Sequence, residues 1–134
     1  MEITLNHTIV PAHDHVESAK WYAEIFGFEF VKEWGHFAVI KVNGTLTLDF
    51  MNKGDGFSFH HYAFKVNDLE FDEIFGRMKA KNVKFSSNPY SVITNAYDEK
   101  INHDYGGRGV YFKDPNGHIL EILTVDYDLD TDPA

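Results

Sequence analysis

Residues 7–14, His7-Thr-Ile-Val-Pro-Ala-His-Asp14, match residues 61–68, His61-Tyr-Ala-Phe-Lys-Val-Asn-Asp68, in their order of residue types. Each segment starts with histidine, continues through a mainly apolar stretch and reaches aspartate seven residues later. Aspartate is a favoured residue at the position that caps the start of a helix. The pattern therefore predicts a strand followed by a helix twice, in a chain that contains an internal duplication.

An amphipathic helix is expected after each aspartate, because apolar residues recur there at spacings of three and four. The stripe that precedes Gly27 consists of Ala19, Tyr22, Ala23 and Phe26. The stripe within residues 69–81 consists of Leu69, Ile74, Phe75 and Met78. Each helix should therefore cover one face of a sheet.

Alternating patterns beyond each helix indicate three further strands in each half. They lie within residues 28–34, 37–42 and 45–51, and then within residues 83–85, 109–113 and 117–125. Asn43-Gly44 and Asp114-Pro-Asn-Gly117 have the composition of tight turns between paired strands. The predicted fold is α+β, with two βαβββ modules that form a curved mixed sheet around a cavity.

We expect a single domain, because each repeat alone is small for enclosing a hydrophobic core. The repeats span about residues 1–54 and 55–126, and residues 127–134 form an acidic tail. Closely spaced aspartates make that tail a solvated, partly disordered end.

The composition argues against several classes of function. A net charge of −9 in 134 residues disfavours a nucleic-acid partner, because such binding requires clustered lysine and arginine. No run of 18 apolar residues is present, so we expect no membrane span. The sequence contains no cysteine and does not start like a signal peptide, which makes the cytoplasm the default location.

Four side chains are predicted to share the concave face of the sheet. Successive residues of a strand point to opposite faces. In Leu48-Asp49-Phe50 and Leu120-Glu121-Ile122 the apolar residues face the helix, which leaves Asp49 and Glu121 on the other face. The same alternation places His7 and His61 on that face, so two imidazoles and up to two carboxylates converge on one cavity.

Taken alone, His7 or His61 is more simply interpreted as a buried, hydrogen-bonded histidine. Their equivalent positions in the two repeats favour metal ligation instead. Glu121 supports this interpretation, because a carboxylate between apolar residues of a central strand needs a partner. For Asp49 the sequence leaves two interpretations open, a metal-directed side chain or a solvated strand end.

The chain resembles the vicinal oxygen chelate superfamily, which includes glyoxalase I, fosfomycin-resistance enzymes, extradiol dioxygenases and bleomycin-resistance proteins. The resembling segments lie near the start, middle and end of the chain. They are Leu5-Asn-His-Thr-Ile-Val10, His61-Tyr-Ala-Phe-Lys-Val66 and Tyr111-Phe-Lys-Asp-Pro-Asn-Gly-His-Ile-Leu-Glu-Ile122.

This resemblance implies that His7, His61 and Glu121 are ligands of one divalent metal ion, with Zn, Ni, Mn, Fe and Co all suited to such a set. Glyoxalase I adds a fourth ligand, a glutamate, at the position where this chain has Asp49, which is shorter by one methylene. The resemblance also implies a homodimer, with each site shared between halves of different chains.

The resemblance implies a metal-dependent enzyme that acts on a small substrate chelated through adjacent oxygens but does not select the reaction, and Asp49 favours a lyase or isomerase of glyoxalase type. A three-ligand extradiol dioxygenase and a fosfomycin-resistance-type transferase stay open as alternatives. The rival from another class is a metal-free, ligand-binding protein of bleomycin-resistance type, which the acidic charge would suit. The complete His-His-Glu set favours the enzyme.

Residues 95–108 are too long for a simple connection and suggest a functional loop, whose simpler interpretation is a flexible surface segment. If the loop is functional, we expect Arg108 to bind an anionic substrate group and either His103 or Tyr105 to donate to it. Gly106-Gly107 would give a lid its freedom. Tyr111, on the next strand, is expected to line the pocket through its hydroxyl.

Overall fold

The computed structural model describes residues 1–131 and divides the chain into two compact units. Of the described residues, unit 1 contains 1–59 and 114–117, and unit 2 contains 60–113 and 118–131. Each unit is built on a four-stranded mixed sheet, so the α+β prediction of two βαβββ modules is confirmed. The strands form two separate sheets, one per module.

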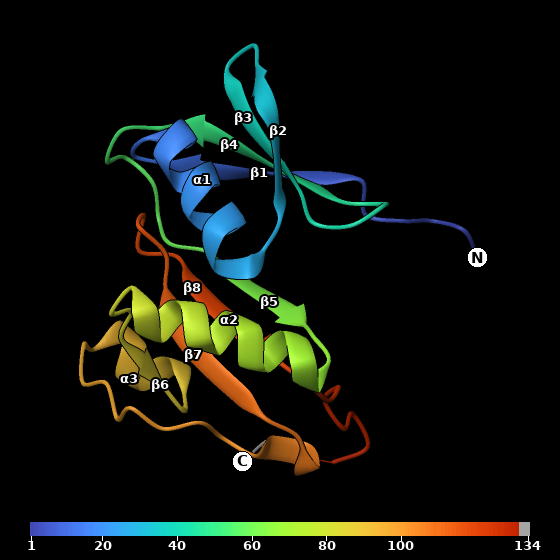
Figure 1. Ribbon diagram of the computed structural model, residues 1–134, viewed down its shortest axis with the longest axis vertical. Helices are drawn as coiled ribbons and strands as arrows, with labels where there is room; N and C mark the ends of the chain where they lie inside the picture. The colour runs from blue at the N-terminus through green and yellow to red at the C-terminus, as the bar shows by residue number, and fades with distance from the viewer. Residues whose placement is uncertain (132–134) are drawn as a thin grey trace. The chain divides into compact units, whose positions relative to one another are not determined.

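Unit 1 contains β1 (His7–Ala12), α1 (His15–Phe26), β2 (Glu29–Trp34), β3 (Phe37–Lys41) and β4 (Thr47–Asn52). The strand order is β1-β4-β3-β2, with β1 parallel to β4 and the other pairs antiparallel. Helix α1 lies against this sheet and buries Tyr22 and Ile25 completely (Figure 1). The expected hairpin at Asn43-Gly44 is present, with the Asn43 side chain accepting from the backbone of Thr45 and Leu46.

Unit 2 repeats this arrangement with β5 (His61–Lys65), α2 (Asp68–Ala80), β6 (Phe85–Ser86), β7 (Gly109–Lys113) and β8 (Ile119–Leu123). The order is β5-β8-β7-β6, and β5 is parallel to β8 (Figure 1). Two short helices lie between β6 and β7: α3 (Pro89–Ile93), and the 3-10 turn η1 (Asp104–Gly106), which falls within the loop expected over residues 95–108. None of the helices within residues 1–131 has the length and hydropathy needed to cross a membrane.

The helix starts follow the expected capping chemistry, with one shift. Asp14 caps α1 by accepting from the backbone N–H of Glu17 at 3.0 Å. In the second module the cap is Asn67 rather than Asp68, and the Glu70 side chain completes a reciprocal pair of hydrogen bonds. Both residue types cap helices, so the pattern alone did not distinguish these neighbours.

The residues of the turn 114–117 are anchored in unit 1 by buried polar contacts. The Tyr22 hydroxyl donates to Asp114 Oδ2 at 2.6 Å, and Asn116 Oδ1 accepts from the Ser18 hydroxyl at 3.1 Å and from the His13 N–H at 2.9 Å. Asp114 is only 6% exposed, and its carboxylate depends on the Tyr22 hydroxyl together with the Asn116 backbone N–H at 2.8 Å and the Asn116 side-chain amide at 3.0 Å.

We therefore expect Tyr22→Phe to lower the free energy of unfolding by about 1 to 3 kcal/mol, the usual cost of removing one partner of a buried polar group. The midpoint of urea unfolding measures this change. Tyr90→Phe is the matched control, because Tyr90 is 78% exposed. Equal midpoints for the two variants would show that the buried hydroxyl contributes nothing.

Candidate functional site

In unit 2, His61 and Glu121 lie next to each other on the parallel pair β5 and β8. His61 is paired with Ile119, so Glu121, two residues further along β8, points to the same face. His61 Nε2 is 3.1 Å from Glu121 Oε1, and His61 Nδ1 is 3.0 Å from the Ile119 carbonyl oxygen. The strand pairing thus places an imidazole and a carboxylate in direct contact.

This pair has the chemistry of a cation site. A carbonyl oxygen only accepts, so Nδ1 of His61 carries the proton and donates to Ile119. The other ring nitrogen then presents a lone pair towards a carboxylate oxygen, which also only accepts. A positive charge between these two atoms, either a proton or a metal ion, makes the contact favourable. A histidine whose Nδ1–H donates to a backbone carbonyl is typical of metal ligands.

Glu121 is a buried carboxylate held by tyrosines. Only 3% of the Glu121 surface is exposed. Tyr111 lies directly opposite Glu121 on the neighbouring strand β7, and its hydroxyl hydrogen bonds to the carboxylate. Tyr127 donates to Glu121 Oε1 at 3.3 Å. Burial raises the pKa of both tyrosines above the usual value, and the charge of Glu121 acts in the same direction. Both phenols therefore stay protonated and serve as donors near neutral pH.

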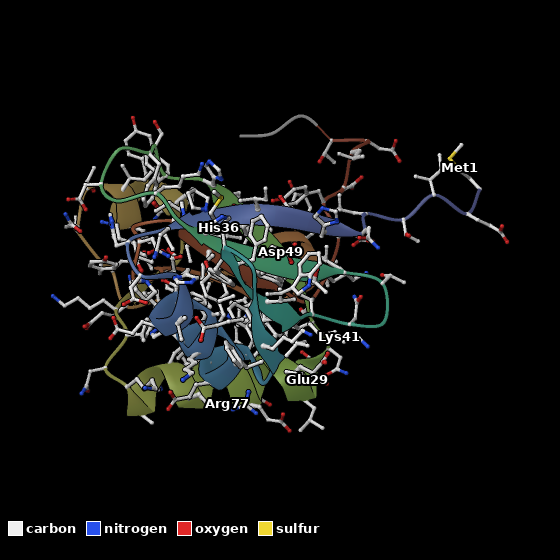
Figure 2. The ribbon with its side chains drawn as sticks, turned by 90° about the horizontal axis from the view of Figure 1, so that it is seen from above. Met1, Glu29, His36, Lys41, Asp49 and Arg77 are labelled. Carbon is white, nitrogen blue, oxygen red and sulfur yellow. The ribbon has the colours of Figure 1, made fainter. Side chains whose placement is uncertain are left out.

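Unit 1 holds His7 and Asp49 in the equivalent register. His7 is paired with Thr47 on β4, as His61 is paired with Ile119 on β8, and Asp49 follows two residues later as Glu121 does. His7 is exposed and hydrogen bonded through Nδ1 to Asn6 at 2.7 Å. Asp49, which is labelled in Figure 2, accepts through Oδ1 from the Thr47 hydroxyl at 2.9 Å.

A cavity of about 390 Å³ opens in unit 1 beside these two side chains. Its walls combine polar groups with an apolar surface that includes the indole of Trp34, which is 63% exposed. The lining residues are Asn6, His7, Val31, Lys32, Trp34, Val39, Thr47 and Asp49. Within residues 1–131, no group of three or more histidine and acidic side chains lies close enough to bind a metal ion by itself.

Arg108 lies against the first turn of α2. Its guanidinium donates to Asp72 Oδ1 at 2.7 Å and to Asp68 Oδ1 at 3.1 Å, and it lies 4.3 Å from the centre of the Phe71 ring. The hydrogen bond to Asp72 raises the Arg108 pKa, and Asp68 adds to the effect. Arg108 therefore ties its loop to α2. Substrate binding by Arg108 stays a prediction, and it requires the guanidinium to exchange these partners for the substrate.

His103 and Tyr111 lie in unit 2 at different places. His103 Nδ1 is 3.2 Å from the Gly107 carbonyl oxygen, and the ring lines an open groove of about 510 Å³ beside Arg108. Tyr111 is partly buried against Glu121 and stacks on His61 with ring centres 6.1 Å apart. Tyr111 thus adjoins the buried carboxylate, whereas His103 supports the loop backbone.

The backbone geometry at Gly106 and Gly107 explains why both residues are glycine, independently of any movement of a lid. Gly106 has φ of +82°, which favours glycine. At Gly107 a Cβ atom would lie 2.5 Å from a methyl carbon of Val125, so only glycine permits this approach.

The loop is also anchored at Asp98, whose carboxylate accepts from the backbone N–H groups of Ser87 and Lys100 at 2.9 Å and from the Ser87 hydroxyl.

The sequence does not predict the roles of Tyr127, Asp98 and the two acidic partners of Arg108. Tyr127 falls in the stretch assigned to a solvated acidic tail, where it is the one aromatic residue. Alternation along β8 does not extend to a residue after the strand has ended, so no periodic pattern marks Tyr127. Sequence spacing equally gives no sign that Arg108 meets α2, 36 and 40 residues earlier.

Comparison with known proteins identifies the family. The model of the Glyoxalase/Bleomycin resistance protein/Dioxygenase superfamily matches residues 4–122. The chain belongs to this superfamily. The fold of the solved structure of Oxidase ChaP-H2 is similar, with 42% identity, a TM-score of 0.87 and coverage of 95% of this chain and 97% of that one. For Oxidase ChaP-H1 the identity is 44%, the TM-score 0.84 and the coverage 93% and 98%.

A metallothiol transferase FosB from Lysinibacillus sphaericus is 23% identical over 126 residues, covering 90% of this chain and 82% of that protein. The fosfomycin resistance protein FosX from Listeria monocytogenes is 21% identical, with a TM-score of 0.70 and coverage of 94% of this chain and 96% of that one. The superfamily fold thus accommodates several reactions, and the residues of each site must distinguish among them.

The anchoring of the loop at Asp98 generates a pH-dependent prediction. Burial opposes the charge of this carboxylate, but the hydrogen bonds from Ser87 and Lys100 dominate and lower the Asp98 pKa to about 2, from an ordinary 3.8. A lowered pKa in the folded state adds stability above the ordinary pKa, and this stability is lost as the pH falls towards 2. We expect Asp98→Asn to cost about 1 to 2 kcal/mol at pH 7.

Urea unfolding of the native protein and Asp98→Asn, at pH values from 7 to 2.5, measures the difference. That difference should shrink as the pH falls below about 4, where the carboxyl of the unfolded chain starts to bind a proton. Glu99→Gln, an exposed neighbour, controls for the loss of one charge. A pH-independent difference would contradict the assigned role of the charge.

Proposed function

We propose that this chain is a metal-dependent enzyme that oxidises a small molecule, with His7, His61 and Glu121 as the metal ligands. The observation that carries the proposal is the 3.1 Å contact between His61 Nε2 and Glu121 Oε1, a contact made by a residue that is only 3% exposed. Similarity to Oxidase ChaP-H1 and Oxidase ChaP-H2, at 44% and 42% identity over almost the whole chain, supports oxidation as the type of reaction.

The ligand types agree with this proposal. Two neutral imidazoles and one carboxylate form the set that non-haem iron enzymes use while they keep open positions for substrates. Mn, Co, Ni and Zn are accepted by the same donors. When bound, such an ion would hold adjacent substrate oxygens and stabilise the negative charge that develops on them.

The surrounding residues have separate tasks in this proposal. Ile119 fixes the tautomer of His61 by accepting from Nδ1. Tyr111 donates its one hydroxyl proton to Glu121 and can redirect it to a substrate oxygen that lies next to the carboxylate. The 390 Å³ cavity of unit 1 suits the apolar part of a substrate on Trp34 and Val39, while Lys32 suits an anionic group.

A lyase or isomerase of glyoxalase type is the second candidate. Asp49 favours it, because this residue occupies on β4 the register position that Glu121 occupies on β8. A fourth protein ligand would fill a coordination position that an oxidase leaves open for oxygen. The 2.9 Å hydrogen bond from Thr47 and the shorter side chain weigh against direct ligation by Asp49.

We further propose that the active form is a homodimer in which His7 of one copy joins His61 and Glu121 of the other, as the superfamily resemblance implies. A cytoplasmic location is proposed from the cysteine-free composition. A metal-free binding protein of bleomycin-resistance type is the outcome if no metal binds.

Elemental analysis of the purified native protein and of His7→Ala, His61→Ala and Glu121→Gln tests the metal centre. We expect about one transition metal ion per chain in the native protein. Each variant should bind the metal more than about 100-fold more weakly, since loss of an outer partner alone typically costs about 10- to 100-fold. His36→Ala is the matched control, because this exposed histidine lies in the turn between β2 and β3 (Figure 2).

Oxygen consumption distinguishes the two candidate activities. Candidate substrates with adjacent oxygens are supplied to the metal-loaded enzyme in a sealed cell with an oxygen electrode, and product is measured with and without oxygen. Turnover that stops without oxygen supports the oxidase, whereas turnover that continues supports the lyase or isomerase. A native protein that binds none of the five metals after reconstitution would overturn both.

A further inference from the structure

Tyr127 folds back onto the buried carboxylate just after β8 ends at Leu123. Its ring is half exposed, with 53% of the residue surface accessible, yet its hydroxyl reaches Glu121 at 3.3 Å. Glu121 itself is 3% exposed. A tyrosine that keeps its ring at the surface while its hydroxyl contacts a buried charge is placed there for the polar contact as well as for packing.

The hydroxyl acts on one particular oxygen. Tyr127 donates to Oε1 of Glu121, the same atom that lies 3.1 Å from His61 Nε2. Tyr111 hydrogen bonds to the carboxylate from the neighbouring strand. Two tyrosine hydroxyls therefore hydrogen bond to the Glu121 carboxylate, and the Tyr127 hydroxyl contacts the oxygen that faces the imidazole.

Contacts on both sides hold Tyr127 in this position. Asp126 forms an ion pair with Lys65 at the end of β5, at 3.0 Å. The ring of Tyr105 packs against the Tyr127 ring with centres 6.1 Å apart. Tyr105 does so from a left-handed backbone conformation, with φ of 57° and ψ of 23°. That conformation is unfavourable for a non-glycine residue, so the surrounding contacts must compensate for it.

The cavity next to the rings of Tyr105 and Tyr127 is small. Tyr105, Tyr111, Tyr127 and Glu121 line a cavity of about 20 Å³, together with neighbouring residues of the loop and β8. A cavity of this size holds about one water molecule. The Tyr127 hydroxyl is therefore directed at the carboxylate and not at an organic ligand in this cavity.

We propose that Tyr127 is a positioning residue, whose hydroxyl orients the Glu121 carboxylate for metal binding. The inference rests on the proposed function, in which Glu121 is a metal ligand. Hydrogen bonds from outer residues fix the orientation of ligating carboxylates, and their loss typically lowers metal affinity about 10- to 100-fold. Tyr127 thus extends the metal centre into a segment that lies outside both repeated modules.

Titration of the metal-free, full-length protein with Co(II), in competition with a chelator, tests this role. Visible absorption of the bound ion reports the coordination geometry independently of any enzymatic activity. We expect Tyr127→Phe, which keeps the ring, to lower Co(II) affinity by about tenfold or more and to alter the visible spectrum. Tyr90→Phe should match the native protein, because Tyr90 is 78% exposed on α3.

Asp126→Asn separates the hydroxyl from the placement of the segment. It removes the exposed ion pair with Lys65 but keeps the Tyr127 hydroxyl, so we expect a loss of less than about fivefold. Equal affinities and spectra for Tyr127→Phe and the native protein overturn the inference while the metal centre stands. A loss in Asp126→Asn as large as in Tyr127→Phe also overturns it. A native protein that binds no Co(II) overturns the proposed function and this inference with it.

Discussion

The parallel pairing of the first and last strands in each module is the constraint on which the site depends. In unit 2 it sets His61 beside Ile119, so Glu121 two residues later must point to the same face. The Ile119 carbonyl then orients the imidazole, and the imidazole in turn faces the carboxylate. A register shift of one residue would turn Glu121 to the helix side and separate the pair.

The two modules use the same backbone geometry for different chemistry. Unit 2 buries its carboxylate, surrounds it with tyrosines and brings it into contact with histidine. Unit 1 places Asp49 at the equivalent position but leaves His7 exposed and opens a wider cavity with a tryptophan in its wall. The two modules therefore share one backbone frame, in which the first carries an exposed histidine beside an open cavity and the second carries a buried carboxylate.

The segment between β6 and β7 is shaped by polar contacts that hold it in place. Asp98 organises its first half through Ser87 and Lys100, and Arg108 closes its second half onto Asp68 and Asp72. These contacts bring Tyr105 to a position from which its ring supports Tyr127. The order of this segment contributes to the surroundings of Glu121 and is therefore relevant to the chemistry proposed for the site.

The sequence by itself determined the duplication, the α+β class, the two helices and the face on which His61 and Glu121 lie. Periodicity encodes these features, because strands alternate every two residues and helices repeat every 3.6. It also placed Asp49 and Glu121 at equivalent positions. Only the tertiary structure decided that Asn67 caps α2, that Arg108 pairs with α2, and that Tyr127 donates to Glu121. These contacts join residues outside any repeating pattern, so they depend on how the chain turns after its regular elements end.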